Sequence, residues 1–114
     1  MVTVLFADIV GYTAMAERLD PEQVKNLVDH WFQRLVVDIT EFGGRVDKIV
    51  GDAIVALFGA PVAHEDDAER AVRSALRMQQ TIASMTLDGA DDLAGGGAAP
   101  VQMRIGVNTG EVLV

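Results

Sequence analysis

The chain has 114 residues, 50% of them hydrophobic, with 17 acidic and 9 basic side chains and a formal net charge of −8. This length suits one domain with a single core, and the apolar content excludes a disordered or low-complexity chain. The negative charge disfavours binding to nucleic acid or anionic lipid, so any bound phosphate has to be held by local groups.

Targeting and membrane signals are missing from the sequence. No apolar run approaches the roughly 18–20 residues of a membrane span, none has the pattern of a signal peptide, and cysteine is absent. These features predict a cytoplasmic chain with no membrane span.

The first expected element is a strand over residues 2–7. Its side chains are apolar on both alternating faces, which is typical of a central strand that is covered on each side. A turn is expected over residues 8–13, where Gly11 permits a sharp change of direction and Thr13 can cap a short helix over residues 14–19.

A second helix is predicted to begin after Asp20, with Pro21 at its first position and Gln23 where a capping box needs it. A Gly-Gly pair ends it. Its apolar residues recur at helical spacing and form one stripe: Val24, Leu27, Val28, Trp31, Phe32, Leu35, Val36 and Ile39. For Trp31 and Phe32 we favour packing in the core over a surface for a partner helix.

Residues 45–50 and 53–58 read as two strands joined by the two-residue turn Gly51-Asp52. An acidic segment then opens a helix over residues 68–85, with apolar residues on one face. Acidic side chains in a first helical turn are stabilised by the positive end of the helix dipole. We therefore interpret His64, Asp66 and Asp67 as capping residues rather than metal ligands.

The last third contains a Gly-rich segment, residues 86–100, which predicts a flexible loop. Residues 101–107 form a further expected strand, 108–110 a turn, and 111–114 the start of another strand.

This order of elements predicts an α+β fold with a ferredoxin-like (split βαβ, palm-like) sheet and helices packed on it. In that topology the third strand lies antiparallel between the first and second, so Asp8 and Asp52 meet at one edge of the sheet. Two carboxylates brought together favour a hard divalent cation such as Mg²⁺. The alternative is that Asp8 only ends a strand and Asp52 only fills a turn.

Three blocks of the sequence resemble those of class III adenylyl and guanylyl cyclase catalytic domains. They are Phe6-Ala7-Asp8-Ile9-Val10-Gly11-Tyr12-Thr13, Lys48-Ile49-Val50-Gly51-Asp52 and Met103-Arg104-Ile105-Gly106-Val107-Asn108-Thr109-Gly110. The resemblance spans residues 1–114. It implies a nucleotidyl cyclase that converts a nucleoside triphosphate into a 3′,5′-cyclic monophosphate with two Mg²⁺ or Mn²⁺ ions per site, for signal transduction.

The resemblance also assigns roles. It implies that Asp8 and Asp52 are the catalytic, metal-binding aspartates and that the backbone carbonyl of Ile9 is a further metal ligand. The implied triphosphate-binding residues are Val10, Gly11, Tyr12, Thr13 and Arg104. N–H groups at the start of a helix point toward anions, which agrees with the first four. The alternative for Arg104 is a solvent-facing charge on a strand.

Lys48 matches the residue that reads the base in adenylyl cyclases, which favours ATP over GTP. Lys48 is expected to share a strand face with Val46 and Val50, which is unusual for lysine unless that face lines a site. The alternative is a surface lysine that extends to water and pairs with Asp47 or another acid.

Family members work as dimers with shared sites, so the resemblance implies a homodimer. The block that the family carries next has no counterpart here, which implies a partial domain lacking the C-terminal part of the cyclase fold. Activity of this chain alone is therefore not implied. A second hypothesis is a catalytically inactive regulatory module that binds nucleotide or a partner cyclase domain. A third is a diguanylate cyclase, whose Gly-Gly-Asp/Glu-Glu-Phe turn is absent.

Overall fold

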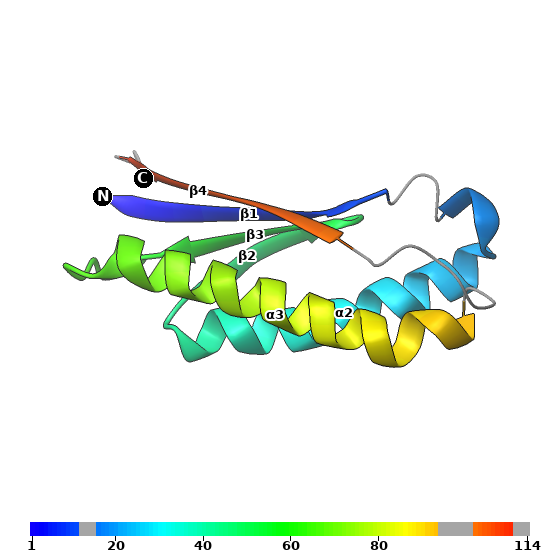
Figure 1. The fold of residues 1–114 in the computed structure, drawn as a ribbon. Coiled ribbons are helices and arrows are strands. Elements are labelled where there is room, and N and C mark those ends of the chain that lie inside the picture. Colours follow the sequence, from blue (N-terminus) through cyan, green and yellow to red (C-terminus); the bar gives the residue numbers. More distant parts are fainter. Residues whose placement is uncertain (12–15, 94–101, 111–114) are drawn as a thin grey trace.

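The computed structural model describes residues 1–11, 16–93 and 102–110. The described strands are β1 (Val2–Val10), β2 (Arg45–Val50), β3 (Ala53–Phe58) and β4 (Gln102–Gly110), and the long helices are α2 (Pro21–Glu41) and α3 (Asp67–Leu93). The strands form one antiparallel sheet in the order β2-β3-β1-β4 (Figure 1). This is the predicted ferredoxin-like α+β fold, with β3 between β1 and β2.

Both helices cover the same face of the sheet, and no helix of the described residues covers the other face, which is called the open face below (Figure 1). Side chains of β1 alternate between the two faces, with Leu5, Ala7 and Ile9 buried against the helices and Phe6 52% exposed on the open face. The prediction that β1 is covered on each side is therefore wrong. Right-handed crossovers from β1 to β2 and from β3 to β4 place α2 and α3 on one side.

The start of α2 has the predicted cap. The backbone N–H of Asp20 donates to the Gln23 side chain, with an N···O distance of 3.1 Å, and Pro21 occupies the first helical position. Trp31 and Phe32 are each only 3% exposed, which confirms that they pack in the core. Most of the stripe is buried with them: Val24, Leu27, Val28, Leu35 and Ile39.

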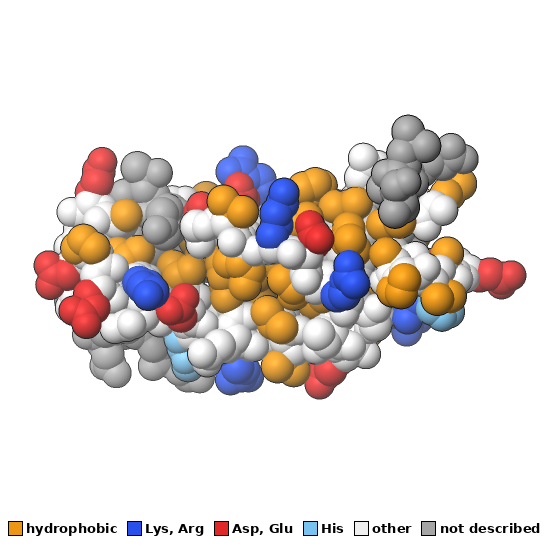
Figure 2. Space-filling view, turned by 180° about the vertical axis from the view of Figure 1, so that it is seen from behind, with side chains coloured by type: hydrophobic (Ala, Val, Ile, Leu, Met, Phe, Trp, Pro, Cys, Tyr) orange, Lys and Arg blue, Asp and Glu red, His pale blue; other side chains and the backbone are white. Residues whose placement is uncertain are grey.

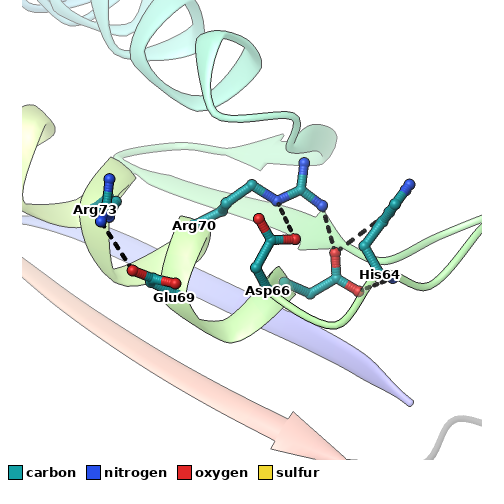
Figure 3. A network of polar contacts seen from close by, with 6 residues as sticks. His64, Asp66, Glu69, Arg70 and Arg73 are labelled. Atoms are coloured by element: carbon teal, nitrogen blue, oxygen red, sulfur yellow. Dashed lines mark hydrogen bonds and ion pairs between the residues drawn. The ribbon is translucent and has the colours of Figure 1, made fainter.

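An ion-pair network holds the start of α3 (Figure 3). The buried carboxylate of Asp67 accepts a hydrogen bond from the His64 backbone N–H at 2.7 Å and one from the Arg70 guanidinium at 2.6 Å. Asp66 lies 3.2 Å from the Nε of Arg70. Both acids thus pair with the Arg70 side chain at the start of the helix.

Asp67 makes stability sensitive to acid. Burial alone would raise the pKa of Asp67, but the hydrogen bond from His64 and the hydrogen bond and charge of Arg70 outweigh it and hold the pKa below its ordinary value of 3.8. Because the folded pKa is the lower one, this carboxylate stabilises the fold above the unfolded pKa. That contribution is lost as the pH falls through the folded pKa.

We expect Asp67→Asn to lower the free energy of unfolding at pH 7 by about 1–2 kcal/mol, since a buried charged acceptor is lost. Asp66→Asn is the matched control: Asp66 is exposed, and exposed ion pairs contribute at most about 1 kcal/mol. Urea unfolding of the chain and both variants at pH 7 and at about pH 2 checks this. The difference in the free energy of unfolding between the unmodified chain and Asp67→Asn should be smaller at the acidic pH. A deficit that is the same at both pH values would contradict the role given to Asp67.

Three element boundaries differ from the prediction. Helix α3 continues to Leu93 instead of ending at residue 85, because a lone Gly89 costs only about 1 kcal/mol in a helix. Strand β4 continues through the expected turn at 108–110, because these residues pair with β1, where the hydroxyls of Thr3 and Thr109 lie 2.8 Å apart. Strand β1 likewise runs to Val10.

Of the short helix predicted over residues 14–19, residues 16–18 are helical. The rest of the predicted short helix, residues 94–100 of the loop and the expected strand at 111–114 lie outside the described residues.

The side of the molecule on which α2 and the edge strand β2 lie carries a band of hydrophobic side chains with charged groups around it (Figure 2). On β2, Ile49 and Val50 are 49% and 61% exposed. In the described part of the chain, no helix combines the length and the apolar character needed to cross a membrane.

Candidate active site

The open face of the sheet brings two of the predicted site residues, Asp8 and Arg104, together. In the sheet register Asp8 of β1 lies opposite Ala53 of β3 on one side and opposite Arg104 of β4 on the other. Residues paired across neighbouring strands share a face, and Asp8 is on the same face as exposed Phe6. The side chains of Asp8 and Arg104 are 42% and 75% exposed. These two residues therefore lie side by side on the face that the helices leave uncovered.

Asp52 reaches the same end of the sheet through the hairpin turn. Gly51 has a positive φ of 59°, which suits the first position of a two-residue hairpin turn. The Ile9 backbone N–H donates to the Asp52 carbonyl oxygen across 3.3 Å, so Asp52 is next to β1, one residue beyond the level of Asp8. The structure thus brings the two predicted carboxylate residues close together, with Asp8 near the end of β1 and Asp52 in the turn just before β3.

The donor groups at this position suit a hard cation. Within one strand residue the N–H and the C=O point to the same side, so the Ile9 carbonyl lies on the side of Asp52. Its side chain is buried under the sheet and only its backbone is available. Two carboxylates and a carbonyl are the oxygen ligands that Mg²⁺ and Mn²⁺ prefer.

An ion pair occupies one of these carboxylates. The Arg104 Nε lies 3.3 Å from the Asp8 Oδ1. Both residues also line a shallow pocket of about 340 Å³ on the open face, with walls that are mainly apolar; it is lined by Phe6, Ala7, Asp8, Ala53, Ile54, Arg104 and Gly106. The pocket combines an apolar surface with one anionic and one cationic group, which are features of many ligand sites.

Phe6 and Gly106 belong to this pocket and were not among the predicted site residues. They are opposite one another in the register, and no atom lies within 4 Å of the position that a Gly106 side chain would take. The sequence did contain a signal for Phe6, because residues two apart on a strand share a face and Phe6 precedes Asp8 by two.

Lys48 lies on the open face too, but not for the predicted reason. The register between β2 and β3 shifts at Asp47, where a β-bulge inserts one residue. Lys48 therefore pairs with Val55 on the open face, whereas Val46 pairs with Ala56 on the helix-covered face. The prediction that Lys48 shares a face with Val46 is wrong. Lys48 forms no ion pair with any residue that the structure describes, so nothing there supports pairing with Asp47.

The predicted phosphate turn is described only in part. Val10 ends β1 opposite Gln102. Gly11 follows with a φ of 79° and open space around it, a conformation that favours glycine. Tyr12 and Thr13 lie outside the described residues.

A family model, a curated relative and two solved structures that are similar to this chain all belong to one class of protein. Residues 1–114 match the family model described as the adenylate and guanylate cyclase catalytic domain. The chain is 30% identical over 112 residues to an adenylate cyclase of Anabaena cylindrica, covering 98% of this chain and 21% of that protein. The chain therefore spans about a fifth of the length of this relative.

Two solved structures are similar in fold and sequence. The guanylyl cyclase Cya2 has a TM-score of 0.84 and 38% identity, over 96% of this chain and 53% of that one. The adenylyl cyclase CyaB from P. aeruginosa has a TM-score of 0.81 and 32% identity, over 96% of this chain and 55% of that one. The similarity therefore covers nearly all of this chain and about half of each solved chain.

Proposed function

Because the chain belongs to the adenylate and guanylate cyclase catalytic domain family, we propose that it carries the metal- and triphosphate-binding part of an adenylyl cyclase site. The reaction would convert ATP into 3′,5′-cyclic AMP and pyrophosphate. The single observation that carries this proposal is the adjacency of Asp8 and Asp52 at one end of neighbouring strands, beside Arg104.

Asp8, Asp52 and the Ile9 carbonyl are proposed to hold two Mg²⁺ or Mn²⁺ ions. When bound, such ions neutralise phosphate charge and lower the pKa of the ribose 3′-hydroxyl. In the reaction the 3′-oxygen forms a bond to the α-phosphorus, the bond from that phosphorus to the β-phosphate oxygen breaks, and the hydroxyl proton passes to solvent. The contribution of Asp8 and Asp52 is to fix this negative, oxygen-rich position at the end of β1 and in the hairpin turn beside it.

Arg104 and the turn after β1 are proposed to hold the triphosphate. Arg104 is mostly exposed, and its guanidinium can form paired hydrogen bonds to phosphate oxygens. The backbone N–H groups of Val10, Gly11, Tyr12 and Thr13 would add donors. Local donors are needed because the net charge of −8 repels a triphosphate.

The choice of ATP over GTP rests on Lys48, since the similar proteins include both adenylyl and guanylyl cyclases. Strand β3 separates β2 from β1, so Lys48 and Asp8 of one chain are two strand spacings apart, or roughly 10 Å sideways. We propose that the base-reading Lys48 serves the site of a second subunit, in a homodimer that covers the open face. Exposed Phe6 and Val50 give that face an apolar surface suited to contact.

A second candidate is a regulatory module that binds nucleotide or a partner cyclase domain without catalysing. Nucleotide contact at exposed Arg104 and partner contact through exposed Phe6 on the open face would be enough for such a role.

Product analysis separates these functions. The chain is incubated with Mn²⁺ and either ATP or GTP, alone and mixed with a complete catalytic domain of the family, and products are identified by mass spectrometry. The cyclase proposal predicts that adding the chain increases cyclic AMP and pyrophosphate, with less product from GTP. The regulatory module predicts instead that the chain changes the activity of the complete domain, and that the Asp8→Ala and Asp52→Ala variants of the chain change it to the same extent.

A further inference from the structure

The Asp8–Arg104 ion pair is the feature of the open face that the proposed function leaves unexplained. The two residues are directly opposite in the β1–β4 register, and the Arg104 Nε contacts the Asp8 Oδ1 at 3.3 Å. Asp8 is the only acid that pairs with Arg104 among the described residues. The carboxylate proposed as a metal ligand is therefore already paired with a cation from its own chain.

A bound metal ion and Arg104 compete for this carboxylate. Mg²⁺ binds carboxylate oxygens at about 2.0–2.1 Å, so an ion on Asp8 would place two positive charges within a few ångströms of each other if Arg104 stayed. Since Arg104 is 75% exposed, its side chain can leave without disturbing the core. Metal binding to Asp8 is therefore opposed by the ion pair and favoured by whatever draws Arg104 away.

We propose that Arg104 is an internal competitor of the metal at Asp8, released when a triphosphate binds. This inference rests on the proposed role of Asp8 as a metal ligand. Phosphate oxygens offer the guanidinium stronger, paired hydrogen bonds than the single contact with Asp8. Arg104 then moves from the carboxylate to the phosphate, and metal and triphosphate favour each other's binding through this one side chain.

The test is metal affinity without nucleotide. Mn²⁺ binding to the 114-residue chain is measured from the loss of the free-ion electron paramagnetic resonance signal at low ionic strength. The variants are Arg104→Gln, Asp8→Ala and a matched control, Arg45→Gln. Arg45 lies opposite Leu57 on β3, far from Asp8 in the register, so its replacement reports only the loss of one positive charge.

Arg104→Gln is expected to bind Mn²⁺ about two- to fivefold more tightly than Arg45→Gln, the range that an exposed ion pair can supply. The difference in Mn²⁺ affinity between the two variants should shrink as salt is added, because salt screens exposed charges. Equal or weaker binding by Arg104→Gln would overturn the competition while leaving the metal site standing. If the unmodified chain binds no more Mn²⁺ than Asp8→Ala, the metal site and the competition both fail.

Discussion

Replacing either Asp8 or Asp52 by alanine is expected to remove specific Mg²⁺ and Mn²⁺ binding while leaving the fold intact. Each change deletes one of the two carboxylates proposed to hold the metal, and a divalent ion held by one carboxylate in water is bound only weakly. The fold should survive because Asp8 points to the open face and Asp52 contributes its backbone carbonyl, which alanine keeps. Calorimetric titration of Mn²⁺ and circular dichroism measure the two properties.

Asp47→Ala is the matched control for both variants. Asp47 is exposed and lies in the same hairpin, at the bulge of β2, so its replacement removes the same charge from nearby without touching the proposed ligands. It should bind Mn²⁺ like the unmodified chain. Unchanged binding in both Asp8→Ala and Asp52→Ala would contradict the two-carboxylate site.

The second large effect concerns the base. In the mixture with a complete catalytic domain, Lys48→Glu is expected to lower the preference for ATP over GTP by roughly 5- to 150-fold. Replacing the lysine donor by a carboxylate acceptor leaves buried hydrogen-bonding groups unpaired. The range corresponds to the free-energy cost of about 1–3 kcal/mol for such groups. Because Lys48 is proposed to touch only the base, affinity for tripolyphosphate should change little. Product ratios from equimolar ATP and GTP measure the preference.

Arg45→Glu is the control for Lys48→Glu. It reverses the same charge on the same strand and the same open face, opposite Leu57 instead of Val55. It should leave the product ratio unchanged. A ratio that stays the same in Lys48→Glu as well would make Lys48 a surface lysine.

The position of the two aspartates could be predicted because it depends only on the order of the strands. Once Gly51-Asp52 is taken as a hairpin and β3 is placed beside β1, the end of β1 must meet the start of β3. The cap at Asp20 and the buried stripe of α2 were equally local signals, since both follow from spacing along one element.

The surroundings of the aspartates could not be predicted in the same way. Nothing in the residues of β2 marks Asp47 as the bulged one, yet this extra residue decides which side chains share a face with Lys48. The ion pair between Asp8 and Arg104 requires the register of β1 against β4, two strands that are far apart in sequence and have no turn between them. Apolar residues on both faces of β1 indicated that both faces of the sheet are covered, but the helices cover only one face.

Complementation tests the central claim most directly. A complete adenylyl cyclase catalytic domain of the family is inactivated by replacing its own two metal-binding aspartates, and cyclic AMP is then measured with ATP and Mn²⁺ after adding this chain. If Asp8 and Asp52 provide the metal-binding part of a shared site, the chain should restore cyclic AMP formation, whereas the Asp8→Ala and Asp52→Ala variants should not. Equal restoration by the chain and by both variants, or none by any of them, would contradict the account.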